Sequence, residues 1–183
     1  MNTQFFFSAF PEFELDDIVL REINLDDVDG YLDYMNRPEM LNFLTKEHIP
    51  NTPEKSLEEL QYWGSLFPTK RSIYWAIALK ECDKIIGTAG FNHFSFANSK
   101  SEISYDLNPD FWGRGIMLKS IKHILKFAEN QLQIVRTQAT VTVDNINSIK
   151  LLERCGFDRE GHMKKYEIVN GVHQDYYLYA RVV

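Results

Sequence analysis

The chain lacks the residue patterns that mark metal, disulfide and membrane proteins. It has two cysteines, Cys82 and Cys155, and they form no CxxC pair that would bind a metal or carry redox chemistry. The five histidines show no HExxH or other ligand spacing, so we expect no metal. No apolar run approaches the roughly 18 residues that a membrane helix needs, and no secretory leader is recognisable. We therefore expect a cytoplasmic protein.

Positive charge is also scarce. The chain has 20 Lys and Arg against 26 Asp and Glu, a formal net charge of -6. Nucleic-acid-binding proteins usually carry a basic surface, so we expect neither a nucleic-acid nor a membrane partner. A modest acidity suits a cationic substrate, but it also simply keeps a protein soluble.

Apolar residues are plentiful. Hydrophobic residues make up 44% of the 183 residues, enough for one domain with a sizeable core. We expect a single domain over residues 1–183, with its core elements between about 18 and 182. No repeat, linker or low-complexity segment divides the chain.

Hydrophobic periodicity and turn residues predict elements in the order β-α-α-β-β-β-α-β-α-β-β. The predicted strands cover residues 18–23, 72–79, 85–91, 102–107 and 134–143, a segment from Phe157, and residues 172–182. The predicted helices begin at Asn24, Pro53, Gly115, and Asp144 or Asn145. The pair Asn170-Gly171 predicts a tight hairpin. The fold class is therefore a mixed α/β sheet with a hairpin meander in its middle.

The segment Asn108-Pro109-Asp110-Phe111-Trp112-Gly113-Arg114-Gly115-Ile116-Met117 precedes a long amphipathic helix. A glycine-rich turn that opens a helix presents free backbone N–H groups and the positive end of the helix dipole to an anion. Side chains at Gly113 and Gly115 would block that approach, although these glycines could merely shape a tight turn. A second block follows: Asn145-Ile146-Asn147-Ser148, then Leu152-Glu153-Arg154-x-Gly156-Phe157.

Together these blocks resemble the GNAT superfamily of acetyl-CoA-dependent N-acetyltransferases, and within it the RimJ/RimL-like branch that acetylates N-termini of ribosomal proteins. That branch also shows the segments seen here as Ile85-Ile86-Gly87-Thr88-Ala89-Gly90, Glu102-Ile103-x-Tyr105 and Asn170-Gly171…Asp175. The resemblance covers residues from about 18 to the C-terminus. It implies the GNAT acyl-CoA N-acyltransferase fold, acetyl-CoA as cosubstrate, and direct attack by a primary amine in a ternary complex. The acceptor would be a protein N-terminus, a polyamine or another small amine.

The resemblance also implies which residues hold the cosubstrate. In the family, the strand that here ends at Leu107 carries a bulge and splays from the next strand, so that pantetheine bonds to its backbone. A backbone N–H near Leu107 would stabilise the oxyanion. The residues expected to bind acetyl-CoA are Leu107, Trp112, Gly113, Arg114, Gly115, Ile116, Met117 and Asn145. For Asn145, the alternative is a pure helix cap.

Acetyl transfer requires deprotonation of the acceptor ammonium, stabilisation of the oxyanion and protonation of the thiolate. We expect Glu102 to be the general base, directly or through a water, unless it is a solvated or ion-paired glutamate. Ser148 is the expected donor to the thiolate, because Leu152 stands where many relatives carry a tyrosine; otherwise Ser148 only starts a helix. Trp75 and Tyr105 would line the acceptor pocket, or belong to the core.

Two further residues depart from the family pattern. Asp110 stands where many relatives carry Gln or Arg, and Met117 where a small residue is common. The missing tyrosine keeps a second function open, a non-catalytic acyl-CoA-binding or sensing module on the same fold. A nucleotide-binding protein is weaker, because the chain has no GxxxxGK[ST] sequence. Both a monomer and a homodimer remain open.

Overall fold

The computed structural model describes residues 9–42, 44, 49–70 and 72–183. Within them, eight strands form one sheet in the order β1-β2-β3-β4-β5-β6-β8-β7. The strands are β1 (Phe13–Leu15), β2 (Ile18–Glu22), β3 (Ile73–Leu79), β4 (Ile85–Ser95), β5 (Lys100–Leu107), β6 (Arg136–Thr142), β7 (Asp158–Val169) and β8 (Val172–Val182). The α-helices are α1 (Val28–Met35), α2 (Pro53–Leu66), α3 (Ile116–Gln131) and α4 (Ile146–Arg154). The predicted mixed α/β fold is confirmed, with the short edge strand β1 added.

The predicted helix starts follow their capping residues. The Thr52 hydroxyl accepts the Lys55 N–H at 3.3 Å, and Pro53 is the first residue of α2. Asn24 caps a 3-10 turn, η1 (Leu25–Asp27), which leads directly into α1. The signal at Asn24 therefore predicted the start of this helical segment, although its first turn is a 3-10 turn.

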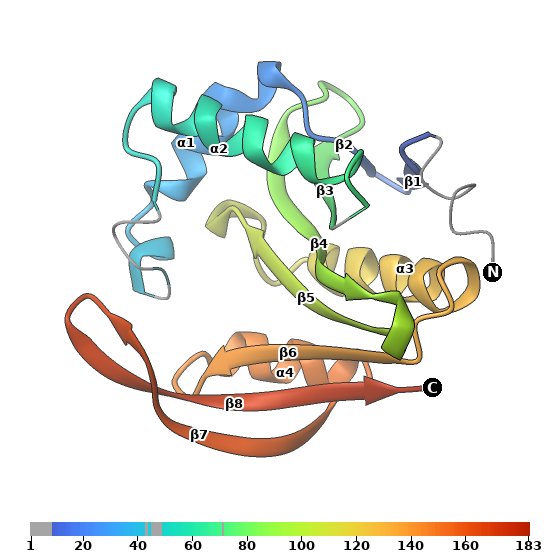
Figure 1. Ribbon diagram of the computed structural model, residues 1–183. Helices are drawn as coiled ribbons and strands as arrows, with labels where there is room; N and C mark the ends of the chain where they lie inside the picture. Colours follow the sequence, from blue (N-terminus) through green and yellow to red (C-terminus); the bar gives the residue numbers. More distant parts are fainter. Residues whose placement is uncertain (1–8, 43, 45–48, 71) are drawn as a thin grey trace.

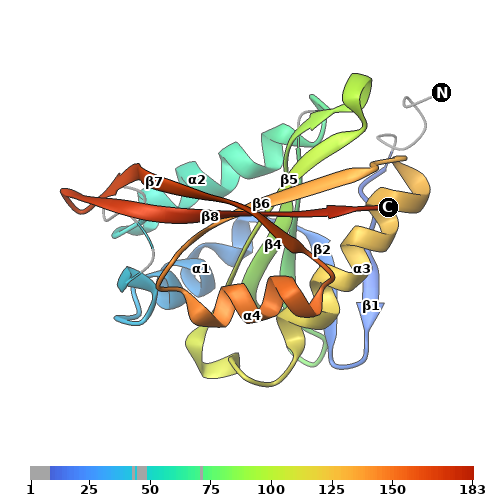
Figure 2. The ribbon, with the colours of Figure 1, turned by 90° about the horizontal axis from the view of Figure 1, so that it is seen from below.

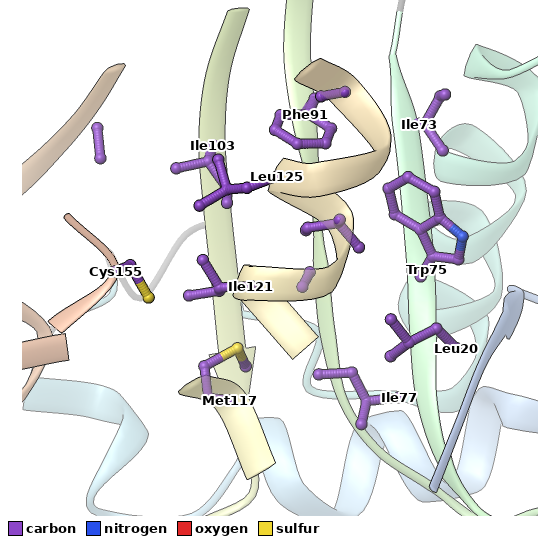
Figure 3. Close-up of a cluster of buried hydrophobic side chains, with 14 of the residues drawn as sticks. Leu20, Ile73, Trp75, Ile77, Phe91, Ile103, Met117, Ile121, Leu125 and Cys155 are labelled. Carbon is purple, nitrogen blue, oxygen red and sulfur yellow. The ribbon is translucent and has the colours of Figure 1, made fainter. Parts of the chain in front are cut away.

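Helices cover both faces of the sheet. Figure 1 shows α1 and α2 together on one side of β2, β3 and β4, with α3 on the other. On the first side, Tyr31 and Tyr34 of α1 and Leu60 of α2 pack on Tyr74 and Ala76 of β3. On the second side, α3 is the centre of the larger core, shown in Figure 3, whose labelled residues are Leu20, Ile73, Trp75, Ile77, Phe91, Ile103, Met117, Ile121, Leu125 and Cys155.

The sheet opens between β5 and β6. These parallel strands pair only over Lys100↔Arg136, Ser101↔Thr137 and Glu102↔Gln138. Figure 1 shows them meeting at one end and diverging toward the end where β5 stops. The described residues therefore leave the β5 edge beyond Glu102 without a partner strand on this side, which is the splay that the family resemblance predicts.

The bulge expected in β5 is absent from its described pairing with β4. That pairing is regular from Gly87↔Leu107 to Asn92↔Glu102, and the register shift lies between Asn92 and Ser95 on β4. The extra residues of β4 include His93, which has a positive φ of 48°. The irregularity is therefore on the neighbouring strand, and divergence from β6 alone opens β5.

The β7–β8 hairpin continues the sheet beyond β6. Asn170 and Gly171 form its turn with φ values of 51° and 81°, the left-handed pair that a tight hairpin turn requires. Figure 2 looks onto this hairpin and shows α4 beside α3. Leu152 and Cys155 at the end of α4 belong to the same core as Ile121 of α3.

Candidate active site

A cavity of about 460 Å³ opens where β5 and β6 diverge. Its walls are the end of β5, the turn into α3, the first turns of α4, and two residues that precede α2. The lining residues are Met40, Leu44, Tyr105, Asp106, Leu107, Phe111, Trp112, Gly113, Gly115, Ile116, Met117, Leu118, Asn145, Asn147, Ser148, Lys150, Leu151 and Arg154. The structure thus brings together most of the site residues expected from the sequence. Glu102, Trp75 and Arg114 do not line this cavity.

The turn into α3 begins with a short capped segment. The Asn108 side chain accepts the Asp110 N–H at 3.0 Å and caps the 3-10 turn η5 (Pro109–Phe111). The Trp112 N–H donates to the Pro109 carbonyl at 3.0 Å. The backbone of Trp112 is therefore not one of the free donors expected from the sequence, and the run of such donors starts at Gly113.

Gly113 and Gly115 hold the backbone open in front of α3. Their φ values are +74° and +77°, and a Cβ at either residue would meet nothing within 4 Å. The first backbone bond of α3 runs from the Lys119 N–H to the Gly115 carbonyl at 3.0 Å. The N–H groups of the first helical turn, Ile116 and Met117 included, therefore have no intrahelical acceptor. An open space faced by such donors fits the diphosphate of coenzyme A.

Arg114 and Asp110 stabilise this turn from outside. The Arg114 side chain donates to the Asp110 carbonyl at 2.7 Å and lies over the Phe111 ring at 5.0 Å from its centroid. Arg37 donates to the Asp110 carboxylate at 3.0 Å. The acid that departs from the family pattern is thus paired with a cation, which offsets its charge near the proposed phosphate site.

The free edge of β5 presents backbone donors to the cavity. The Asn108 N–H donates to the Ile86 carbonyl at 2.8 Å, toward β4. Because N–H groups alternate sides along an antiparallel strand, those of Leu107 and Tyr105 point the other way, toward the opening. Trp112 donates its indole N–H to the Leu107 carbonyl at 2.7 Å. This edge can pair with an extended ligand and can stabilise an oxyanion.

Two hydroxyl groups meet across the cavity. The oxygens of Tyr105 on β5 and Ser148 on α4 lie 2.8 Å apart. Burial raises the pKa of Tyr105 well above its ordinary value, so its hydroxyl stays protonated. Leu152, at the position of the family's tyrosine, is 1% exposed and belongs to the core. The tyrosine hydroxyl at this cavity therefore comes from β5, and the α4 hydroxyl that it meets is that of Ser148.

Asn145 both caps α4 and lines the cavity. Its side-chain oxygen accepts the Ser148 N–H at 3.1 Å, which confirms the capping interpretation. The NH₂ group of the same side chain keeps its own donors, since the cap uses only the oxygen. Capping thus does not prevent the expected contact with pantetheine, which stays a prediction.

Asp106 is the one carboxylate among the lining residues that the structure describes. It accepts the Tyr34 hydroxyl at 2.6 Å, the Thr88 hydroxyl at 2.5 Å and the Thr88 N–H at 3.1 Å. Burial raises the pKa of its carboxyl, and the hydrogen bonds from Thr88 and Tyr34 lower that pKa in part. The sequence placed Asp106 on the same strand face as Glu102, but nothing in it distinguished the two acids.

Glu102 lies away from the cavity. Its carboxylate accepts the Gln138 side-chain amide at 3.2 Å, and its backbone is the last of β5 to pair with β6. Glu102 is thus at the fork of the two strands, four residues before Asp106. Its role as general base stays a prediction, without support from a contact in the cavity.

Trp75 is a core residue, and its assignment to the acceptor pocket is wrong. Its side chain is fully buried and donates its indole N–H to the Pro11 carbonyl at 2.6 Å. It packs against Phe10, Phe91 and Phe127 on the α3 side of the sheet. The alternation of β3 explains this, since Tyr74 and Ala76 face the opposite side.

Lys150 and Arg154 are cavity residues that the sequence reasoning missed. They are four residues apart on α4, so they share one helix face. Their four-residue spacing on a predicted helix is the sequence signal by which they could have been found.

Within the described ranges, no three His, Cys, Asp or Glu side chains gather as metal ligands. None of the helices in those ranges combines the length and apolar character of a membrane span.

Comparisons with known proteins agree with this geometry. Residues 17–158 match the family described as the acetyltransferase (GNAT) domain. The chain is 28% identical over 173 residues to the uncharacterized N-acetyltransferase YoaA of Bacillus subtilis (strain 168), which covers 94% of this chain and 97% of YoaA.

Solved structures superpose over nearly the whole chain. The microcin C7 self-immunity acetyltransferase MccE, in complex with acetyl-CoA and AMP, has a TM-score of 0.84 at 27% identity, covering 92% of this chain and 94% of MccE. The ribosomal-protein-S5-alanine acetyltransferase of Vibrio fischeri also has a TM-score of 0.84, at 25% identity, covering 94% of this chain and 96% of that protein.

Proposed function

The chain belongs to the GNAT acetyltransferase family, and from this premise we propose that it transfers the acetyl group of acetyl-CoA to a primary amine by direct attack in a ternary complex. The acceptor is a protein N-terminus or a small amine. One observation carries the proposal: the free β5 edge and the glycine turn of α3 face the same cavity. The turn suits a diphosphate, and the edge suits the amide-bearing pantetheine arm.

The residues divide between binding and chemistry. The N–H groups from Gly113 to Met117 bind the diphosphate, and the β5 edge at Leu107 binds the pantetheine, with Asn145 donating its NH₂ from α4. Bound in this way, acetyl-CoA supplies the thioester that the amine attacks. The backbone N–H of Tyr105 or Leu107 then stabilises the negative charge that develops on the carbonyl oxygen.

Ser148 protonates the leaving thiolate. Its hydroxyl lies 2.8 Å from that of Tyr105, so the proton that Ser148 gives up is replaced through Tyr105 from solvent. This pair supports a catalytic enzyme over an acyl-CoA sensor. The sensor hypothesis depended on the absence of a tyrosine at Leu152. In our proposal, the Tyr105 hydroxyl replaces the hydroxyl of that missing tyrosine.

Thiol release is the direct test. The purified protein is incubated with acetyl-CoA and a panel of amines: an alanine-starting peptide, spermidine, ethylamine and trifluoroethylamine. Free thiol is followed with a chromogenic reagent, and the acetylated product is identified by mass spectrometry. We expect amine-dependent thiol release with at least one of these amines. Tight acetyl-CoA binding without release would favour the sensor instead.

Ser148→Ala tests the proposed acid. We expect kcat to fall about a hundredfold, as when general-acid catalysis is lost, while the KM for acetyl-CoA changes little. Ser65→Ala, on the exposed surface of α2, is the matched control and keeps wild-type rates. Unchanged turnover in Ser148→Ala would remove Ser148 from the mechanism.

A further inference from the structure

We propose that the Asp106 carboxylate receives the ammonium group of the acceptor in the cavity and takes its proton before attack. The inference rests on the proposed function and assigns the general base of that same site. It also defines the acceptor class: an amine that arrives positively charged. The proposal replaces Glu102, which the sequence favoured for this role.

The hydrogen bonds of Asp106 leave one acceptor position open. A carboxylate accepts about four hydrogen bonds, two on each oxygen. Among the residues that the structure describes, one oxygen accepts the Tyr34 hydroxyl and the Thr88 N–H, and the other accepts only the Thr88 hydroxyl. The residue as a whole has intermediate exposure and lines the cavity, and its carboxyl is enclosed enough for burial to raise its pKa. Three fixed donors therefore orient the carboxylate, and its second oxygen keeps a position for a substrate N–H.

The position of Asp106 on β5 places it beside the reacting atoms. Its neighbours Tyr105 and Leu107 present their N–H groups to the opening, where the thioester carbonyl would bind. The side chain of Asp106 points to the α1 side, toward Tyr34, while the Tyr105 hydroxyl meets Ser148 of α4. Base and acid thus approach the reaction from opposite faces of one strand, as attack and departure require.

The charges around Asp106 favour binding of a cation. Tyr31 and Tyr34 of α1 and Tyr74 of β3 interact with its charge, and Glu59 of α2 interacts with both α1 tyrosines. Burial raises the pKa of each of these tyrosines, so they are neutral hydroxyls at neutral pH. Among the described lining residues, the cations are Lys150 and Arg154, and both come from α4, on the other side of the sheet. An ammonium group is therefore the natural counter-ion on this side.

Glu102 meets none of these conditions. It lies at the fork, accepts a hydrogen bond from Gln138, and is outside the cavity lining. Four residues of extended strand separate it from Asp106, roughly 13 Å along β5. A proton transfer requires contact directly or through one water, so Asp106 is the better placed of the two acids.

The step balances in protons and bonds. The ammonium gives one proton to Asp106, and the nitrogen lone pair forms the C–N bond as the carbonyl becomes an oxyanion. When the oxyanion collapses, the C–S bond breaks, the nitrogen gives its second proton to solvent, and the thiolate takes a proton from Ser148, which solvent restores through Tyr105. Asp106 then returns its proton to solvent, so the net result is one proton on sulfur and one proton released.

Asp106→Asn is the central experiment. The amide preserves the shape and can still accept the Tyr34 hydroxyl and the Thr88 N–H, while the Thr88 hydroxyl accepts from its NH₂. We expect kcat/KM for ethylamine to fall about a hundredfold, and acetyl-CoA affinity to stay near wild type. The loss should be much smaller with trifluoroethylamine, which is already neutral at the assay pH. If Asp106 had a purely structural role, the variant would lower kcat/KM equally for both amines.

The pH profile supplies the second readout. Asp106 must be ionised to accept a proton, so wild-type kcat/KM rises with pH through its pKa, and Asp106→Asn loses that rise. Tyr34→Phe removes a hydrogen bond that lowers the pKa of Asp106, so the rise should move to higher pH. An unmoved profile in both variants would overturn the proposal.

Two further variants separate the remaining outcomes. Asp33→Asn removes an exposed carboxylate from α1 and is the matched charge control, with rates equal to wild type. Glu102→Gln tests the competing acid: a large loss there, with Asp106→Asn unaffected, overturns our assignment in favour of Glu102. If the wild-type protein releases no thiol with any amine of the panel, the proposed function fails and the inference fails with it.

Discussion

At the scale of single residues, Gly115 combines a backbone angle with an open space. Its φ of +77° is one that residues with a side chain rarely adopt, and a Cβ there would meet nothing within 4 Å. Gly115→Ala should therefore weaken acetyl-CoA binding about tenfold, through backbone strain and through the methyl group that enters the phosphate space. Isothermal titration calorimetry with acetyl-CoA measures this change directly.

Gly171 provides a matched control for that variant. It has a φ of +81° and the same free surroundings, but it lies in the β7–β8 turn and does not line the cavity. Gly171→Ala therefore carries the same kind of strain without touching the phosphate site. If both alanine variants lost the same acetyl-CoA affinity, backbone strain alone would explain the effect at Gly115, and the phosphate-binding role of the glycine turn would be contradicted.

The limit of sequence reasoning is also visible at single residues. The glycine turn was predictable because its donors, its glycines and its helix are adjacent in the chain. The role of Asp106 was not predictable, because the hydrogen bonds that orient its carboxylate come from Tyr34 and Thr88, which are 72 and 18 residues away. The prediction for Trp75 was wrong for a related reason. The sequence alone does not show whether an aromatic residue on a strand faces the core or a pocket.

At the scale of elements, α4 contributes polar side chains to the cavity. Ser148 lies in its first turn, and Lys150 and Arg154 follow toward its end. In the proposed binding mode, backbone groups of the glycine turn bind the diphosphate, so we expect the α4 cations to bind a second phosphate. Lys150→Ala with Arg154→Ala should raise the KM for acetyl-CoA about tenfold, as expected for the loss of charged hydrogen bonds.

Comparison of two cosubstrates identifies the phosphate that α4 contacts. With acetyl-dephospho-CoA, which lacks the 3′-phosphate, wild type and the double variant should have nearly equal KM values. Lys126→Ala, on the exposed side of α3, controls for the loss of a surface charge. If the double variant is impaired equally with both cosubstrates, the α4 cations act on the diphosphate or only on the fold.

Element boundaries were predictable where a local signal exists. Helix α2 begins at Pro53 after the Thr52 cap, and the β7–β8 hairpin turns at Asn170-Gly171, both as predicted. Strand β4 runs to Ser95, beyond the predicted end at residue 91, because the register shift after Asn92 lets pairing resume past an irregular backbone. Such a resumption depends on the partner strand, so the local pattern of β4 does not contain it.

At the scale of the whole molecule, the sheet consists of two parts joined by a short seam. Strands β1 to β5 form one part and β6 to β8 the other, and they pair only over Lys100–Glu102 of β5. Beyond the seam, the core between α3 and α4 holds the two parts together on one face. A ligand laid along the free edge of β5 would therefore contact both parts and replace the missing strand pairing.

Hydrogen exchange on the intact protein tests this completion of the sheet. We expect acetyl-CoA to slow exchange of the Tyr105 and Leu107 amides, because their N–H groups face the opening and would gain acceptors from pantetheine. The Asn108 amide, already bonded to the Ile86 carbonyl at 2.8 Å, should change little and serves as the internal control. Gly115→Ala should lose the protection at equal acetyl-CoA concentration, since occupancy falls with affinity. Protection of all three amides alike would instead indicate a general stabilisation of the fold, without a strand-like contact at the β5 edge.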